Sequence, residues 1–182
     1  MQVIDTALPE IKILEPKYFE DYRGYFCETY SKRTVEKCGI FCEFVQDNQS
    51  LTLKKGTIRG IHFQNAPHAQ SKLVRCIRGR IMDFAVDLRK SSPTYKKWVS
   101  VELSEENHRQ LWIPAGFGHA LLTLVDNCEV QYKVDEFYFP DYDRGIAWND
   151  PEIGIGWGIS TPIVSEKDAN SPPLCKSDVN FE

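Results

Sequence analysis

The chain lacks any apolar run that approaches the ~18 residues of a membrane-spanning helix, so we expect no transmembrane segment. Its first residues, MQVIDTALPEIKILEP, have neither the basic start nor the apolar middle of a signal peptide. Basic residues are not in excess either: 22 Lys and Arg stand against 26 Asp and Glu, a net charge of −4. This balance gives no indication of nucleic-acid binding, and basic groups that bind a small anion must be gathered locally.

Regular cysteine spacing is also absent, since the six cysteines include no C-x-x-C pair. This argues against a zinc site or a disulfide framework. Several of them lie within apolar, strand-like runs, where a free thiol behaves as a small hydrophobe. We therefore expect buried or incidental thiols in a reducing, cytoplasmic setting. They are Cys27, Cys38, Cys42, Cys76, Cys128 and Cys175.

Internal repeats, low-complexity segments and linkers are missing as well. What recurs instead is short runs rich in Val, Ile, Phe and Tyr between turn residues, a pattern typical of a sandwich or barrel. The length suits one domain spanning residues 1–182. We expect strands at residues 72–78, 81–88, 98–103, 109–113, 119–125 and 128–134.

The first two of these strands flank Gly79-Arg80, which predicts a β-hairpin. Short helices are expected over 31–39 and 165–169, the first with Ser31 as N-cap and Gly39 just past its end. The best fit is an all-β jelly roll, a cupin-like double-sheet barrel with a few short helices. N-terminal strands and the tail after residue 162 should pack on the barrel. Residues 81–88 alternate and should present one apolar face, made of Met82, Phe84, Val86 and Leu88.

One strand-like run, GTIRGIHF over residues 56–63, carries two polar groups among apolar neighbours. Alternation along a regular strand would point Arg59 and His62 to opposite faces. They can share a cavity only if Gly60 marks a β-bulge, a known use of glycine beside active sites. A lone strand histidine is more often structural than catalytic, so this run alone leaves the choice open.

A second motif, IPAGFGHALLTL, places His119 in the P-x-G-x-x-H form of the second motif of cupins. In metal-binding cupins, a first motif adds an H-x-H pair and a glutamate. Here that first motif reads His62-Phe63-Gln64, and no glutamate follows at a suitable spacing. Two imidazoles and an amide make a poor metal site, so we expect no metal and favour proton transfer by histidine.

Three further polar residues have ordinary structural explanations when each is taken alone. Lys72 in QSKLVRC suits a solvated strand position, and Tyr132 in EVQYKV suits packing with its hydroxyl at a rim. Asp168 completes an S-x-x-D capping box with Ser165. The three residues together indicate a shared functional site only when the whole sequence is compared with a known family.

Seven stretches follow one another in the order and spacing of a known family over nearly the whole chain. The sequence resembles the dTDP-4-dehydrorhamnose 3,5-epimerases, a family of nucleotide-sugar enzymes. The supporting stretches are DYRGYFCETY, FVQDNQS, GTIRGIHFQ, QSKLVRCIRGRIMDFAVDLRKSSPTY, KKWVSVELSEENHRQLWIPAGFGHALLTL, YKVDEFYFPDYDRGIAWNDP and SEKDA.

The resemblance implies a homodimeric jelly roll that acts on dTDP-4-dehydro-6-deoxyglucose without a metal or redox cofactor. It implies that His62 is the catalytic base, with Asp168 as its carboxylate partner. Tyr132 would be the proton donor and Lys72 the group that stabilises an enolate. The implied substrate contacts are Arg23, Glu28, Gln46, Asn48, Arg59, His119, Asp143 and Lys167.

The chemistry of a 4-keto sugar is consistent with these roles. The C4 ketone acidifies the protons on C3 and C5, and an imidazole with an ordinary pKa near ~6.5 is a suitable base at neutral pH. Inversion requires a new proton on the opposite face, which a second acid must supply. A cation beside the developing oxyanion stabilises the enolate.

Two alternatives stay open at this stage. Asp143 stands where the family commonly has glutamate, and such departures allow a single-centre epimerase on a related 4-keto sugar nucleotide. A non-catalytic sugar-nucleotide-binding cupin is the alternative of another class, and a metal-dependent cupin enzyme ranks third.

Overall fold

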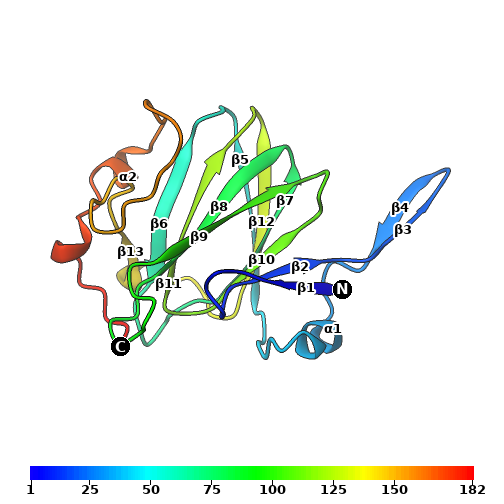
Figure 1. The fold of residues 1–182 in the computed structure, drawn as a ribbon, viewed down its shortest axis with the longest axis horizontal. Helices are drawn as coiled ribbons and strands as arrows, with labels where there is room; N and C mark the ends of the chain where they lie inside the picture. Colours follow the sequence, from blue (N-terminus) through cyan, green and yellow to red (C-terminus); the bar gives the residue numbers. More distant parts are fainter.

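The computed structural model describes all 182 residues, Met1 to Glu182, as two facing antiparallel sheets with short helices (Figure 1). One sheet contains β1 (Gln2–Asp5), β2 (Lys12–Glu15), β5 (Gln46–Thr52), β7 (Lys72–Arg78), β10 (Gln110–Ile113) and β12 (Cys128–Val134). The other contains β6 (Ile58–Gln64), β8 (Arg80–Asp87), β9 (Trp98–Ser104), β11 (Phe117–Thr123) and β13 (Asp143–Gly145). A separate hairpin of β3 (Tyr18–Asp21) and β4 (Gly24–Cys27) projects away from the body (Figure 1).

The strand orders are those of a double-sheet barrel. The six-stranded sheet runs β1-β2-β10-β7-β12-β5, and the five-stranded sheet runs β13-β6-β11-β8-β9. Consecutive strands therefore repeatedly change sheets, which confirms the predicted all-β jelly-roll class. The strands expected at 72–78, 98–103, 109–113, 119–125 and 128–134 are all present, with ends shifted by a few residues at most.

Both predicted helices are present and short: α1 (Lys32–Lys37) and α2 (Glu166–Ala169). Gly39 follows α1 with a φ of 79°, the left-handed conformation that ends many helices. The Ser165 side chain caps α2 by accepting a hydrogen bond from the Asp168 backbone N–H at 3.1 Å. No helix combines the length and the apolar character that a membrane crossing requires.

The predicted hairpin around Gly79-Arg80 is wrong. Strands β7 and β8 do follow one another, but they do not pair, because they belong to opposite sheets. Gly79, with a φ of 77°, turns the chain from one sheet to the other, and an added Cβ there would lie 3.0 Å from the Cys128 sulfur. A glycine between two apolar strands indicates a sharp turn, and sequence alone does not show whether that turn closes a hairpin or a corner.

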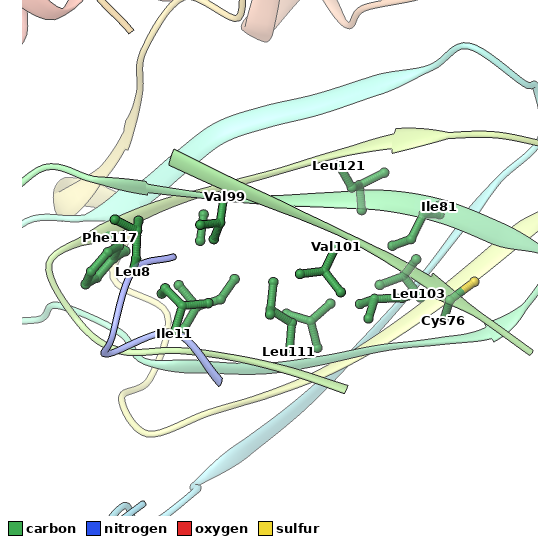
Figure 2. Close-up of a cluster of buried hydrophobic side chains, with 14 of the residues drawn as sticks. Leu8, Ile11, Cys76, Ile81, Val99, Val101, Leu103, Leu111, Phe117 and Leu121 are labelled. Carbon is green, nitrogen blue, oxygen red and sulfur yellow. The ribbon is translucent and has the colours of Figure 1, made fainter. Parts of the chain in front are cut away.

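The alternation predicted in β8 is real, but its apolar face points out of the barrel. Phe84, Val86 and Leu88 pack beneath the C-terminal segment, together with Trp157 and Phe181. The tail therefore covers the outer face of the smaller sheet with buried apolar contacts. The inner face of β8 carries Ile81 and Ala85, which join the core between the sheets (Figure 2).

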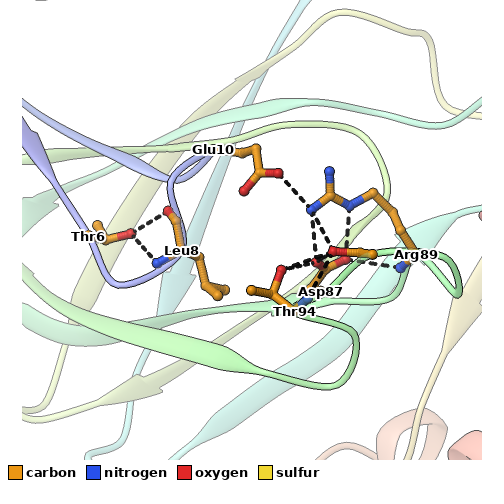
Figure 3. A network of polar contacts seen from close by, with 7 residues as sticks. Thr6, Leu8, Glu10, Asp87, Arg89 and Thr94 are labelled. Atoms are coloured by element: carbon orange, nitrogen blue, oxygen red, sulfur yellow. Dashed lines mark hydrogen bonds and ion pairs between the residues drawn. The ribbon is translucent and has the colours of Figure 1, made fainter.

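One polar network ties the loop that follows β8 to the N-terminal loop (Figure 3). The Asp87 side chain has no exposed surface and accepts hydrogen bonds from Arg89, Ser92 and Thr94 at 2.5–2.9 Å. Arg89 also donates to Glu10 at 3.1 Å, which ties the N-terminal loop to this site. Burial alone would raise the pKa of Asp87, but these donors lower it to about 2.

We expect Asp87→Asn to lower the free energy of unfolding by about 1–3 kcal/mol at neutral pH, because buried hydrogen bonds to a charged acceptor are lost. A carboxylate with a lowered pKa stabilises the fold above its ordinary pKa of 3.8 and stops doing so as the pH falls to about 2. The difference between variant and wild type in urea unfolding should therefore shrink over that interval. An equal difference at pH 7 and at pH 2.5 would contradict this account.

Candidate active site

A cavity of about 650 Å³ lies between the two sheets, a size suited to a small-molecule ligand. Strands β5, β7 and β12 line it from the larger sheet, and β6 and β11 line it from the smaller one. Helix α2 and β13 close its side. Ten of the twelve predicted site residues line this one cavity: Gln46, Asn48, Arg59, His62, Lys72, His119, Tyr132, Asp143, Lys167 and Asp168.

A β-bulge at Gly60 allows Arg59 and His62 to share the cavity, as the bulge hypothesis required. His62 pairs with His119 and Arg59 pairs with Leu121, so that two residues of β6 oppose only Ala120 of β11. Gly60 has a φ of 125°, and an added Cβ would lie 2.5 Å from the Ala120 Cβ. Only glycine permits this backbone conformation together with this approach of the two strands.

His62 is held from behind by a buried carboxylate. Its Nε2 lies 2.6 Å from Oδ1 of Asp168, a residue only 3% exposed. Burial would raise the pKa of Asp168. Hydrogen bonds from His62, the Gly60 amide and Ser165 nevertheless lower this pKa below its ordinary value. The carboxylate fixes the ring with its Nδ1 left for the cavity, the arrangement of a general base.

A second histidine–carboxylate pair lies on the neighbouring strand. His119 stands directly opposite His62, and its Nε2 lies 2.7 Å from Oδ1 of Asp83 on β8. Asp83 has no exposed surface. Sequence reasoning missed it, although an aspartate between the core residues Ile81 and Ala85 was a signal of a buried polar role.

Lys72 and Tyr132 face these histidines from the larger sheet. Burial lowers the pKa of Lys72 to about 8, although the charges of Asp143 and Asp83 favour its ammonium form. Burial, followed by the charge of Asp143, raises the pKa of Tyr132 and keeps its hydroxyl protonated. One wall of the cavity thus carries imidazoles, and the other carries a phenol and an amine.

The mouth of the cavity carries further polar groups that could hold an anionic ligand. Lys167 donates to Oδ2 of Asp143 at 2.5 Å, and Tyr138 donates to the same oxygen at 3.3 Å. The Arg59 guanidinium is oriented by Thr52 on β5 at 2.8 Å. Arginine forks of this kind suit charge-assisted bonds to phosphate oxygens.

Arg23 and Glu28 are the two predicted contacts that do not line the cavity. Arg23 lies in the turn between β3 and β4 and pairs with Asp21 at 2.6 Å. Glu28 follows the hairpin and accepts a hydrogen bond from Thr34 at 2.7 Å. Within one chain, neither is placed to touch a ligand in the cavity.

No group of three or more His, Cys, Asp or Glu side chains is arranged to hold a metal ion. The cavity instead gathers groups suited to proton transfer inside a jelly-roll barrel. Fold and site together define a cupin-like barrel whose cavity is equipped for acid–base chemistry on a small molecule.

Comparison with known proteins identifies the family. The profile of the dTDP-4-dehydrorhamnose 3,5-epimerase family matches residues 5–176. The chain is 51% identical to the dTDP-4-dehydrorhamnose 3,5-epimerase of Salmonella typhimurium over 176 residues, 96% of either chain. The chain belongs to this family of epimerases, as its sequence motifs indicated.

Two solved structures share its fold. The dTDP-4-dehydrorhamnose 3,5-epimerase of Bacillus anthracis, with TDP and pyrophosphate bound, is 49% identical with a TM-score of 0.92, covering 94% of this chain and 98% of that one. The 3,5-epimerase of Legionella pneumophila, in complex with dTDP-4-keto-L-rhamnose, is 41% identical with a TM-score of 0.92, covering 97% and 94%.

We expect Gly60→Ala to lower the free energy of unfolding by more than about 2 kcal/mol, because it combines a clash with a disfavoured backbone conformation. Gly156→Ala is the matched control, since nothing lies within 4 Å of an added Cβ and its φ is not positive. Thermal unfolding of the two variants measures the difference. Equal stability would show that β6 does not need this bulge.

Proposed function

We propose that the chain converts dTDP-4-dehydro-6-deoxy-D-glucose to dTDP-4-dehydro-L-rhamnose by epimerisation at C3 and C5, without a metal or redox cofactor. One observation carries this proposal: His62, paired with Asp168 of α2, and Tyr132 stand on opposite sheets and line one cavity. Inversion needs a base on one face of the sugar ring and an acid on the other. The described relatives bind or act on nucleotides of this kind.

The reaction begins with proton removal beside the C4 ketone. Neutral His62 takes the proton through Nδ1, while Asp168 stabilises the imidazolium that forms. Negative charge then develops on the C4 oxygen. The Lys72 ammonium stabilises this enolate, a contribution of the kind worth ~3 kcal/mol for a single donor.

Reprotonation from the other side completes the inversion. Tyr132, protonated because its pKa is raised, donates to the carbon from the wall opposite His62. Arg59 and Lys167 bind the diphosphate, and Gln46 and Asn48, joined by a 2.8 Å hydrogen bond, contact the substrate from β5. The same groups could act at one carbon only, so a single-centre epimerase remains the second candidate.

Solvent exchange separates the candidates. With dTDP-4-dehydro-6-deoxyglucose in D₂O, we expect NMR to show deuterium entering at both C3 and C5. Activity should be unchanged after treatment with EDTA. Deuterium at one carbon alone would identify a single-centre epimerase, and no exchange at all would identify a binding protein.

Two variants test the assigned roles in the same assay. His62→Asn should bind substrate but lose exchange by about 10²–10⁴-fold, the usual contribution of a general base. Tyr132→Phe should retain exchange while failing to complete inversion, because deprotonation does not need the opposite acid. Tyr95→Phe is the matched control, since Tyr95 packs against the core beside the outer face of the smaller sheet and does not line the cavity. Full inversion by Tyr132→Phe would refute its role.

We further infer that the chain acts as a homodimer in which each hairpin reaches a second copy. An isolated two-stranded hairpin is at best marginally stable, and this one exposes Tyr22 (97%), Phe26 (70%) and Phe19 (57%). Exposed aromatics gathered on one projecting element are typical of an interaction surface. The hairpin carries Arg23, a predicted contact that its own cavity lacks. A second copy of the chain would cover the exposed aromatics, and its hairpin would supply the Arg23 that each cavity lacks.

Mixed dimers test this arrangement. We expect light scattering to give the mass of a dimer, and Arg23→Ala alone and His62→Asn alone to be weakly active. Mixing the two variants after co-refolding should restore activity, because one site of each mixed dimer then contains an intact His62 and the partner's Arg23. A Lys17→Ala and His62→Asn mixture is the control. A monomeric mass, or no recovery, would contradict the inference.

We also infer that this enzyme works in the cytoplasm as one structural unit of residues 1–182. All six cysteines are free thiols, which suits a reducing compartment. The N-terminal strands β1 and β2 pair with β10, and the C-terminal segment packs on the smaller sheet, so both ends of the chain contribute to the same barrel.

A further inference from the structure

Asp83 is the buried carboxylate that the reaction described above does not use. Asp83 has no exposed surface, and only its Oδ1 has a hydrogen-bond partner, the Nε2 of His119. Its Oδ2 is buried without a partner in the chain. A buried carboxylate oxygen with no donor is costly in free energy, so its presence needs an explanation.

The position of Asp83 supplies one. On β8 it pairs with Leu121 of β11, and it stands behind the wall of the cavity rather than in it. His119, a cavity residue, contacts Oδ1 through its Nε2. Lys72 is buried in the lining of the same cavity, and the negative charge of Asp83 favours its ammonium form. The apolar side chains of Ile81 and Ala85 flank it on the same face of the strand. In such surroundings a negative charge acts strongly on its neighbours.

The two histidine–carboxylate pairs differ in one respect. Both oxygens of Asp168 accept hydrogen bonds, from His62 and from the Gly60 amide. Asp83 makes the same Nε2 contact to its histidine but leaves Oδ2 free. The negative charge of Asp168 is neutralised in part by two local donors. Asp83 has only one donor, so more of its negative charge acts on a cation in the cavity.

We propose that Asp83 is a positioning residue of this epimerase: it holds His119 in the tautomer protonated at Nε2 and supplies a buried counter-charge for the Lys72 ammonium. His119 then presents an unprotonated Nδ1 to the cavity as a hydrogen-bond acceptor. The ammonium stays available for the enolate oxygen. The proposal rests on the proposed function of the same cavity.

The charge of Asp83 has a consequence for pH dependence. Burial lowers the pKa of Lys72 to about 8, while Asp143 and Asp83 oppose that effect. Because the ammonium form is the active one, turnover should be lost as the pH rises through this pKa. Removing the Asp83 charge lowers the pKa further and moves the loss to lower pH. The other titratable groups that line the same cavity are Arg59, His62, His119, Tyr132, Tyr138, Lys167 and Asp168.

Asp83→Asn separates charge from shape, since it keeps an acceptor for Nε2 but removes the negative charge. We expect kcat to fall by about tenfold or more with KM little changed, because the lost interaction is stronger in the transition state. The alkaline limb of the kcat profile should move to lower pH. Asp87→Asn, on the same strand but away from the cavity, should be less stable than wild type with an unmoved limb. An unmoved limb in Asp83→Asn would overturn the counter-charge role.

The tautomer is measured on the wild-type protein, so the test does not depend on a variant that folds. The chain has only four histidines, which makes ¹⁵N-labelled imidazoles resolvable, and His119→Asn assigns the signals. We expect His119 to carry its proton on Nε2, and Asp83→Leu, which removes the acceptor, to populate both tautomers. A wild-type His119 protonated at Nδ1 would overturn the positioning role. Wild type without deuterium exchange would instead refute the proposed function, while the tautomer stays measurable.

Discussion

The close approach of β6 to β11 at Gly60 is the constraint on which the rest of the site depends. A regular strand would send Arg59 and His62 to opposite faces, and the extra residue in the bulge brings both to the cavity. The same bulge turns the Gly60 amide toward Asp168, so the carboxylate that contacts His62 is also held by the backbone of the strand that carries His62. One glycine thus couples the positions of His62, Asp168 and the Arg59 guanidinium, which are the proposed base, its carboxylate partner and a proposed phosphate contact.

The walls of the cavity then divide the chemical roles between the two sheets. The smaller sheet supplies imidazoles backed by carboxylates, and the larger sheet supplies Lys72 and Tyr132. Because each sheet is held by its own ladder and by the shared core (Figure 2), the distance between His62 and Tyr132 is set by packing rather than by a flexible loop. Such preorganised groups stabilise charge without rearrangement during the reaction.

Much of this organisation could be predicted from local sequence, because strand periodicity, the Ser165 cap and the motif around His62 are short-range signals. The assignment of strands to sheets could not. The local sequence around Gly79 is compatible with a hairpin and with a corner. The choice depends on the pairing of β7 with β12 and of β8 with β11, whose partner residues lie 30 to 62 positions apart in sequence. The role of Asp83 was missed for a related reason. Strand alternation predicts which face of the strand it occupies, but only the fold shows that its side chain contacts His119.

The arrangement of charges explains how an acidic protein can hold an anionic nucleotide. Two cations at the cavity have a local anchor: Lys167 is paired with Asp143, and Arg59 is oriented by Thr52. The charges of Asp143 and Asp83 favour the ammonium form of the third, buried Lys72. The anchors orient the cations and lower the cost of burying them, since an isolated ammonium in this position would lose its proton. A diphosphate can then compete for Arg59 and Lys167 at the open mouth, where exchange with water is easy. Lys72 is more deeply buried, and the charges of Asp143 and Asp83 favour its ammonium form. In the proposed mechanism this is the cation that meets the charge of the enolate.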